Sequence, residues 1–358
     1  MKIVSAGYEF INEPDAIKKI ERIARICYKS EDKIGECTDI KMVKALIKNQ
    51  HTAMLEHASV VLIIDRGSYN YLNKIKDIME TCCLCKHDAI PENCYMRFTY
   101  TTIVKDESSA FHRYMVSGNL RAWYNFFKFA KQYGYSIPVT VFDSVNNASK
   151  HIFDEFADNV GIQEGCEYFF KSSTPNAILV IDFNELTSEE RMIHEDISIL
   201  FTVDRGVTHE LVRHRNCSFA QESTRYCNYN LGKFGQEITV IEPCFWDITP
   251  ENGTSESIAC YNAWHDSCVF AEAQYFNIIN NGGTPQQARD VLPTSVKAEI
   301  AMTTNLSEWK HIFNLRACDA TGPAHPQMKE VMIPCMKEIR PQYDFAFGNL
   351  IAADEVAK

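Results

Sequence analysis

The stretch from Ile197 to Arg215 reads ISILFTVDRGVTHELVRHR, and the rest of the chain is organised around it. Its first seven residues alternate in the manner of a strand that turns one face to the core. Helical neighbours two positions apart point to different sides, so Arg213 and Arg215 must serve two groups or lie where a helix gives way to a loop. The stretch therefore predicts a strand that leads into a cationic turn.

Positive charge gathers in this region of an otherwise acidic chain. The formal net charge is -11, yet four arginines, two histidines and two serines lie within the 22 positions from 204 to 225. Arginine suits bidentate contact with phosphate. A surface helix laced with ion pairs is the alternative. The short polar residues that follow Arg215 are poor helix formers and rich in donors and acceptors, so they favour a loop that grips an anionic ligand.

Composition bounds the class of protein. The 358 residues are enough for one large domain or two smaller ones, and 46% hydrophobic with 23% charged residues is ordinary for a globular chain. An acidic balance argues against non-specific binding to nucleic acid or to an anionic membrane. No apolar run reaches transmembrane length, and fourteen cysteines occur without a small-scaffold framework. We therefore expect reduced thiols and a cytoplasmic location.

For the fold we expect the α+β class: a central sheet flanked by helices, with an additional, mainly helical lobe from an insertion. Asn12 is expected to cap a first helix that has Pro14 in its first turn. Asn305 and Glu308 make a capping box for the last major helix. The other expected helices are about 40–48, 122–127, 255–280 and one that starts at 284–285, and the expected strands are 2–4, 60–64, 177–181, 197–203, 238–241 and 296–302.

The spacing of the cationic turn resembles a known family. Arg213-His214-Arg215, seven residues and then Ser223 match the defining motif of the flavin-dependent thymidylate synthases. The surrounding DRGVTHELVRHR and SFAQESTRYCNY are similar to that family as well. Further similar segments are RICYKS at 25–30, HTAMLEH at 51–57, ARDVLP at 288–293 and NLR at 314–316.

This resemblance implies a reaction and its partners. It implies synthesis of dTMP from dUMP, with 5,10-methylenetetrahydrofolate as the carbon donor and NADPH as the reductant of a bound FAD, which passes a hydride onward. It also implies a homotetramer whose active sites are shared between subunits. In that family no enzyme nucleophile attacks the pyrimidine, so none of the cysteines needs a catalytic role.

The resemblance also implies site residues. Arg316 would stabilise negative charge that develops on the pyrimidine, as an oxyanion hole does. The residues expected at dUMP are Glu210, Arg213, Gln221, Glu222, Ser223, Thr224, Arg225, Arg289 and Arg316. The residues expected at FAD are His51, Arg213, His214, Arg215, Gln221, Asn305 and His311. Ala53 stands where the family often has a small hydroxyl residue, so no side-chain contact is expected there.

The resemblance divides the chain into a discontinuous synthase core, 1–64 and 191–345, and a tail, 346–358. Residues 65–190 form an inserted lobe, as in a longer branch of the family. Two short pairs of similar stretches, which occur in the same order along the chain, suggest that this lobe is a degenerate partial copy of the core. The stretch 55–67 parallels 194–206, and 119–123 parallels 305–309. Chance similarity is the alternative, because only long self-similarity is diagnostic.

Other readings of the chain remain open. Cys82, Cys85, His87 and Cys94 invite a zinc site, but only one C-x₂-C pair exists, so a cysteine-rich helix end without metal is expected. A thymidylate synthase with a cysteine nucleophile is a rival, although Cys244 lacks the Pro-Cys-His context of that family. A catalytically inactive nucleotide-binding or zinc-linked interaction protein is another, against which the joint retention of the arginines and Ser223 argues.

Overall fold

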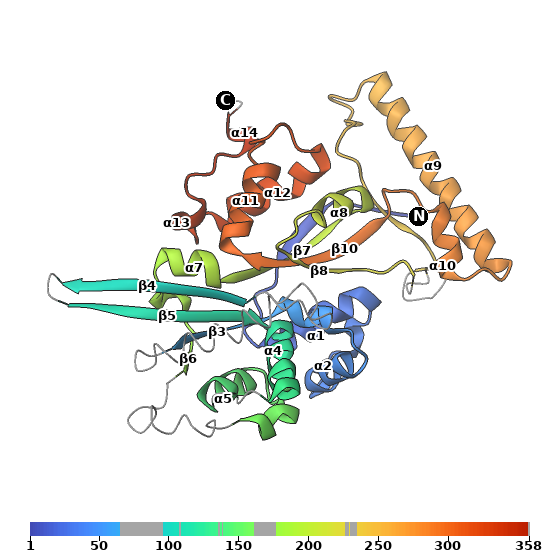
Figure 1. Cartoon of the computed structure of the whole chain (residues 1–358). Helices are drawn as coiled ribbons and strands as arrows, with labels where there is room; N and C mark the ends of the chain where they lie inside the picture. The colour runs from blue at the N-terminus through green and yellow to red at the C-terminus, as the bar shows by residue number, and fades with distance from the viewer. Residues whose placement is uncertain are drawn as a thin grey trace. The chain divides into compact units, whose positions relative to one another are not determined.

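The computed structural model describes residues 1–64, 96–106, 109–134, 137, 139–160, 177–225, 229 and 235–356. Contacts divide the chain into two compact units. Unit 1 comprises Met1–Asn12, Ala24–Asp32 and Ile197–Lys358, and unit 2 comprises Glu13–Ile23 and Lys33–Asp196. Sheets and helices occur in both, which confirms the α+β class (Figure 1). The boundaries of the inserted lobe stay a prediction, and Cys82, Cys85, His87 and Cys94 lie outside the described residues.

Unit 1 contains two sheets built from distant parts of the chain. A two-stranded parallel sheet pairs β1 (Lys2–Val4) with β9 (Thr239–Ile241). A four-stranded sheet has the order β2-β7-β10-β8, in which β2 and β7 are antiparallel, as are β10 and β8. Its strands are β2 (Gly7–Phe10), β7 (Asp196–Asp204), β10 (Lys297–Asn305) and β8 (Ser218–Gln221).

Helices follow the strands of unit 1 and close its core. Trp309 and Phe313 are fully buried, and their rings stack with centroids 5.4 Å apart, as expected for core residues. The helices are α8 (Arg205–Leu211), α9 (Ser255–Asn280), α10 (Pro285–Ala288), α11 (Leu306–Arg316), α12 (Pro326–Ile339), α13 (Asp344–Phe347) and α14 (Ala353–Val356), and the short 3₁₀ helices are η1 (Glu31–Lys33) and η7 (Arg289–Val291).

Unit 2 has its own four-stranded sheet in the order β4-β5-β3-β6, with every neighbouring pair antiparallel. The strands are β3 (Ser59–Ile64), β4 (Met96–Asp106), β5 (Ser109–Asn119) and β6 (Ala177–Leu179). The helices are α2 (Thr38–Lys48), η2 (Thr52–His57), α4 (Leu120–Tyr133), α5 (Val139–Ala148), η4 (Asp154–Asn159), η5 (Phe183–Glu185) and α7 (Ser188–His194). Helix α1 (Ala16–Tyr28) contributes residues to both units.

The long β4–β5 hairpin is a feature that the sequence signals did not predict (Figure 1). Residues in the expected aromatic helix do form a core: Trp123 and Phe127 of α4 are fully buried, and Phe127 packs edge-on to Phe142 and Phe153. Among the described residues, no helix combines the length and apolar character needed to cross a membrane.

Two local predictions were wrong. Asn12 does not cap α1, because the Asp15 carboxylate accepts the backbone N–H groups of Ile17 and Lys18 at 3.0 and 3.1 Å. An anion at that position also suits the positive end of the helix. The segment from Ser218 to Gln221, expected as part of a loop, is the edge strand β8, whose backbone is satisfied by β10. The loop that was expected to bind a ligand is therefore shorter than expected and starts at Glu222.

Candidate functional site

The Arg213-His214-Arg215 triplet lies just beyond the end of helix α8. The Asp204 side chain caps the helix by accepting the Val207 N–H at 2.7 Å, and α8 ends at Leu211. A turn follows, in which the His214 N–H donates to the Leu211 carbonyl at 3.1 Å. In this turn Arg213 and Arg215 are exposed while His214 is buried. The two guanidinium groups thus lie where the helix gives way to a loop, one of the two arrangements expected from their spacing.

Arg316 joins the end of α11 to this turn. Its Nε donates to His214 Nε2 at 3.2 Å, and its Nη1 donates to the Glu210 carboxylate at 3.0 Å. Residues more than a hundred positions apart therefore form one cluster of Glu210, His214 and Arg316. Because the guanidinium is always charged and acts only as a donor, His214 must accept through Nε2 and carry its ring proton on Nδ1.

The same cluster keeps the imidazole neutral. Burial, followed by the positive charge of Arg316 and then by His311, lowers the pKa of His214 to about 4. A neutral ring beside a fixed guanidinium is a hydrogen-bonding group rather than a second cation. The cluster therefore offers one strong positive charge, on Arg316, partly balanced by Glu210.

A second set of residues surrounds the motif serine. At the end of β8, Gln221 Nε2 donates to Thr208 Oγ1 of α8 at 3.0 Å. The Ser223 N–H donates to the Cys27 carbonyl at 3.2 Å, and the Arg225 N–H donates to Ser223 Oγ at 3.3 Å. These bonds fix the serine hydroxyl at the start of the loop.

Arg225 connects this loop to α10. Its Nε donates to Gln286 Oε1 at 2.9 Å, and Arg289 follows in the next 3₁₀ turn with 44% of its side chain exposed. The capping box of Thr284 and Gln287 starts α10, at the position where a helix was expected to start. Glycines at 282 and 283 end the preceding helix and Pro285 begins the next one, which is the Gly-stop and Pro-start pattern. Arg225 is thus hydrogen-bonded to the short helix α10, and Arg289 follows directly after that helix.

The remaining expected residues differ in their surroundings. Asn305 caps α11 by accepting the Glu308 N–H at 2.9 Å, and His311 is exposed on the same helix. Thr224 is half-buried, and Glu222 is buried against lysines. His51 is exposed and precedes η2 in unit 2.

The sequence analysis did not identify two residues that form hydrogen bonds with expected site residues: Thr208, which bonds to Gln221, and Gln286, which bonds to Arg225. Thr208 lies inside the recognised DRGVTHEL segment, so its place in that segment was a usable signal. Gln286 had no signal, because a glutamine in a capping turn is ordinary.

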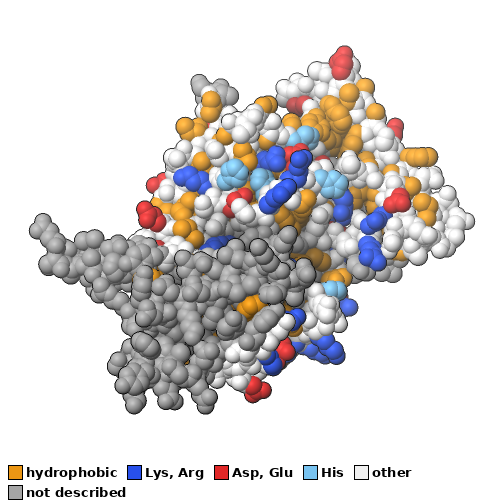
Figure 2. Space-filling model, viewed as in Figure 1, with side chains coloured by type: hydrophobic (Ala, Val, Ile, Leu, Met, Phe, Trp, Pro, Cys, Tyr) orange, Lys and Arg blue, Asp and Glu red, His pale blue; other side chains and the backbone are white. Residues whose placement is uncertain are grey.

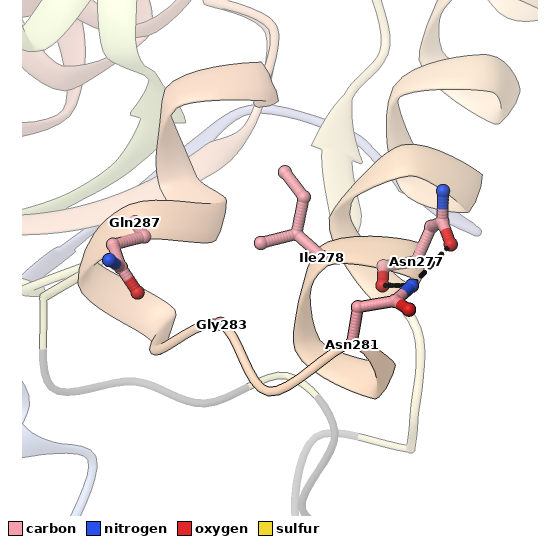
Figure 3. A pocket seen from close by; sticks show the side chains of 5 residues that line it. All are labelled: Asn277, Ile278, Asn281, Gly283 and Gln287. Carbon is pink, nitrogen blue, oxygen red and sulfur yellow. Dashed lines mark hydrogen bonds between the residues drawn. The ribbon is translucent and has the colours of Figure 1, made fainter.

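Basic and histidine side chains gather on the face of unit 1 over α8 and α11 (Figure 2). A separate cavity of about 380 Å³ lies between the end of α9 and α10, lined by Asn277, Ile278, Asn281, Gly283 and Gln287 (Figure 3). Its polar groups are neutral amides, two of which bond to each other at 2.9 Å. An anionic nucleotide fits the cationic face better than this uncharged hollow.

Residues 186–342, which hold both sets of contacts apart from Cys27, match the family model of the thymidylate synthase complementing proteins, Thy1. The chain carries a Thy1 domain. The Thy1 region starts at the approach to α7 and ends just after α12, so it includes α8, β8, β10 and α11.

Curated relatives agree with the Thy1 match. A flavin-dependent thymidylate synthase from Pyrococcus horikoshii is 31% identical over 173 residues, which cover 48% of this chain and 66% of that protein. One from Pyrococcus furiosus is 31% identical over 155 residues, covering 42% and 58%. One from Corynebacterium glutamicum is 27% identical over 154 residues, covering 41% and 58%. The aligned part thus spans 58–66% of the length of these relatives.

A solved structure is also similar in part. The UMP/dUMP methylase PolB from Streptomyces cacaoi, bound with 5-Br UMP, is 20% identical with a TM-score of 0.35, over 43% of this chain and 75% of that one. A score of that size is too low to define the fold. The resemblance seen in the sequence is confirmed by the Thy1 match and the curated relatives.

Proposed function

We propose that this chain makes dTMP from dUMP by flavin-dependent reductive methylation. The observation that carries the proposal is the cluster of Glu210, His214 and Arg316, which lies inside the Thy1 region. It sets one fixed positive charge against a neutral imidazole. The relatives that share this region are named flavin-dependent thymidylate synthases. By that likeness, 5,10-methylenetetrahydrofolate is the carbon donor and NADPH the reductant.

The nucleotide would be held by the loop after β8 and its neighbours. Arg213, Arg225 and Arg289 are exposed, so their guanidinium groups can reach a phosphate dianion. The Ser223 hydroxyl accepts one backbone N–H and keeps its own proton to donate. The other residues assigned to dUMP are Glu210, Gln221, Thr224 and Arg316.

Arg316 would act on the pyrimidine itself. When C5 of the ring becomes nucleophilic, negative charge grows on the ring oxygens, and a fixed guanidinium stabilises that charge without reorganising. The bonds to His214 and Glu210 hold the Arg316 side chain in place before substrate arrives. Arg316 is therefore the residue to which we assign catalysis.

The residues present fit a flavin with a phosphate-bearing tail. Neutral His214 and exposed Arg213 and Arg215 provide donors of the kind that such a group needs. When bound, the flavin supplies the hydride chemistry. Gln221, Asn305 and His311 of unit 1 are also assigned to it, and the assignment of His51 stays a prediction from the resemblance. In keeping with the family we propose a homotetramer with shared active sites.

A cysteine nucleophile is disfavoured by the chemistry of Cys244. Although Cys244 is exposed, desolvation of its thiol and then the nearby carboxylates of Glu330 and Asp204 raise the pKa of Cys244 to about 11. The thiolate is the attacking species, so such a group is almost entirely inactive near neutral pH. This argues against Cys244 as the nucleophile, in keeping with a family in which no enzyme nucleophile attacks the pyrimidine.

One anaerobic assay tests the proposal. Purified protein is supplied with FAD, NADPH, dUMP and 5,10-methylenetetrahydrofolate, and dTMP is measured by chromatography. We expect dTMP only when all of these are present, and yellow protein with flavin absorbance. Nucleotide binding without dTMP would instead establish the inactive nucleotide-binding protein.

A further inference from the structure

Four charged side chains meet behind the loop that carries Ser223. Lys29 follows α1, Glu222 follows β8, and Lys297 and Glu299 belong to β10. Lys297 Nζ lies 3.3 Å from the Glu222 carboxylate and 2.7 Å from that of Glu299. Lys29 Nζ lies 3.7 Å from Glu222 and pairs closely with Glu299. Each lysine thus contacts both carboxylates, and the Glu222 side chain is only 2% exposed.

Backbone bonds tie the same residues to the loop. The Glu222 N–H donates to the Glu299 carbonyl at 2.8 Å, and the Glu299 N–H donates to Glu222 Oε2 at 3.4 Å. The Glu222 carbonyl accepts Arg205 Nη2 at 3.1 Å, and the next N–H, of Ser223, donates to Cys27. The chain at Glu222 is therefore held from three directions.

Side-chain alternation separates Glu222 from its neighbours. In extended chain, successive side chains point to opposite faces. Gln221 turns to Thr208 of α8, whereas Glu222 turns to the two lysines. Glu222 therefore lies within the motif, but its carboxylate is directed at the lysines and already occupied there.

Lys297 and Glu299 keep their charges in this setting. Burial lowers the pKa of Lys297, but Glu222 and Glu299 raise it further, and it stands above its ordinary value. Burial raises the pKa of Glu299, but Lys297 and Lys29 lower it, and it stands below its ordinary value. A cavity of about 520 Å³, lined by Lys29, Glu222 and Lys297 among others, lets water reach the lysines. Partial hydration limits the desolvation cost of such a network.

We propose that this four-charge network of Lys29, Glu222, Lys297 and Glu299 positions Ser223 for the phosphate of the nucleotide, and that Glu222 is a positioning residue and not a ligand. The two lysines also neutralise a carboxylate that would otherwise repel the phosphate beside it. The proposal rests on the proposed function for the identity of the ligand. The positioning of the loop itself is measurable without turnover.

The test uses the full-length protein and four variants. Glu222→Gln keeps the shape and removes the charge, Lys297→Met removes one cation, and Lys297→Arg keeps it. Lys329→Met is the matched control, because Lys329 has a similar exposure and pairs with Asp319 at 2.7 Å outside the network. Amide hydrogen exchange is followed in peptides covering 218–225, and KM and kcat are measured with dUMP.

We expect exchange at the Glu222 and Ser223 amides to quicken roughly tenfold in Glu222→Gln and Lys297→Met, as for loss of one charge-assisted hydrogen bond. The KM for dUMP should rise by a similar factor while kcat stays within about twofold, since orientation of the chemistry by Arg316 is untouched. Lys297→Arg and Lys329→Met should behave as the wild type. If Glu222→Gln fails to fold, Lys297→Met carries the test.

Three results would overturn the proposal. Unchanged exchange with a raised KM would make Glu222 a direct ligand. Faster exchange spread over β10 and α11 as well would show general stabilisation rather than positioning. An unchanged KM with faster local exchange would show that the network holds a loop the nucleotide does not need. If the wild-type protein makes no dTMP, the proposed function fails. Amide exchange and the affinity for dUMP, measured by calorimetric titration, then still test whether the network positions the loop.

Discussion

Arg316 is the single residue to which we assign catalysis. Replacing it with Ala removes the charge that we propose for stabilising the pyrimidine, along with the bonds to His214 and Glu210. We expect kcat to fall by roughly 10²–10³-fold, as for removal of one oxyanion-hole donor. Flavin absorbance should persist, because Arg213 and Arg215 remain.

Ser307→Ala, on the exposed side of the same helix, is the control for the Arg316 variant. Wild-type turnover in Arg316→Ala would remove this residue from catalysis. Loss of flavin together with activity would instead make it a cofactor-binding residue.

His194 links stability to pH in unit 2. Its ring is buried between Ser117 Oγ at 2.7 Å and Thr99 Oγ1 at 2.8 Å, and burial, with Arg97 next, lowers the pKa of His194 to about 4 from the ordinary 6.5. Between pH 6.5 and 4, His194 is therefore protonated in the unfolded chain but stays neutral in the folded chain. Stability is fully present above pH 6.5 and falls as the pH drops towards 4.

We expect the free energy of unfolding to decrease by up to about 1.4 kcal/mol per pH unit for this histidine within that window. Urea unfolding at several pH values measures the slope, and His194→Asn should flatten it. His214, whose pKa is also lowered to about 4, contributes in the same direction and remains in the variant. An identical slope in His194→Asn would show that His194 is not the linked group.

At the scale of elements, the two units repeat one arrangement. In unit 2 the central strand β3 neighbours β5, and in unit 1 the central strand β7 neighbours β10. Both β5 and β10 end in an asparagine. Asn119 and Asn305 then cap α4 and α11, accepting N–H groups at 2.8 and 2.9 Å. Trp123 and Trp309, four residues on, donate to carbonyls of β3 and β7. These parallels support our proposal that residues 65–190 include a degenerate copy of the core unit.

The tryptophan bonds give a matched test of this arrangement. Trp123→Phe and Trp309→Phe keep most of the ring but leave the carbonyls of Val60 and Ile197 without the indole donor, whose distances are 3.3 and 3.1 Å. Each should lower the free energy of unfolding by about 1–3 kcal/mol. Denaturant unfolding followed by circular dichroism measures the change.

Trp264→Phe is the control, because the buried Trp264 Nε1 has no hydrogen-bond partner among the residues that the structure describes. Trp264→Phe should lower the free energy of unfolding clearly less than Trp123→Phe and Trp309→Phe do. Equal costs for all three variants would show that ring volume, not the hydrogen bond to the strand, sets the stability.

At the scale of the molecule, the Thy1 region cannot complete its own sheets. Within 186–342, β7 lacks its antiparallel partner β2 and β9 lacks its parallel partner β1. Phe313 also loses the edge contact of Phe347, whose ring lies 5.5 Å away. Exposed strand edges with unsatisfied backbone groups favour aggregation over folding.

We therefore expect a fragment of residues 186–342 to lack cooperative thermal unfolding and near-ultraviolet dichroism. A fragment of 186–358 mixed with a peptide of residues 1–32 should regain part of both. A cooperative transition in the 186–342 fragment alone would show that the N-terminal strands are dispensable.

The sequence by itself determined the elements whose signals are local. The alternation of Ile197 to Val203 predicted β7, the Gly-stop and Pro-start pattern placed the end of α9, and Asn305 marked the start of α11. The Arg-His-Arg spacing selected the family because such a run of residues rarely arises by chance. Capping and periodicity act over a few residues, so they can be read without knowledge of the fold.

Tertiary structure alone decided what these elements contact. The partners of Arg316, the neutral state of His214 and the burial of Glu222 against lysines all join segments far apart in the chain. The strands β5 and β8 likewise pair with β3 and β10, which lie far from them in the chain, so local propensity alone does not decide them. Desolvation and pairing of charges depend on such long-range packing, which no local pattern encodes.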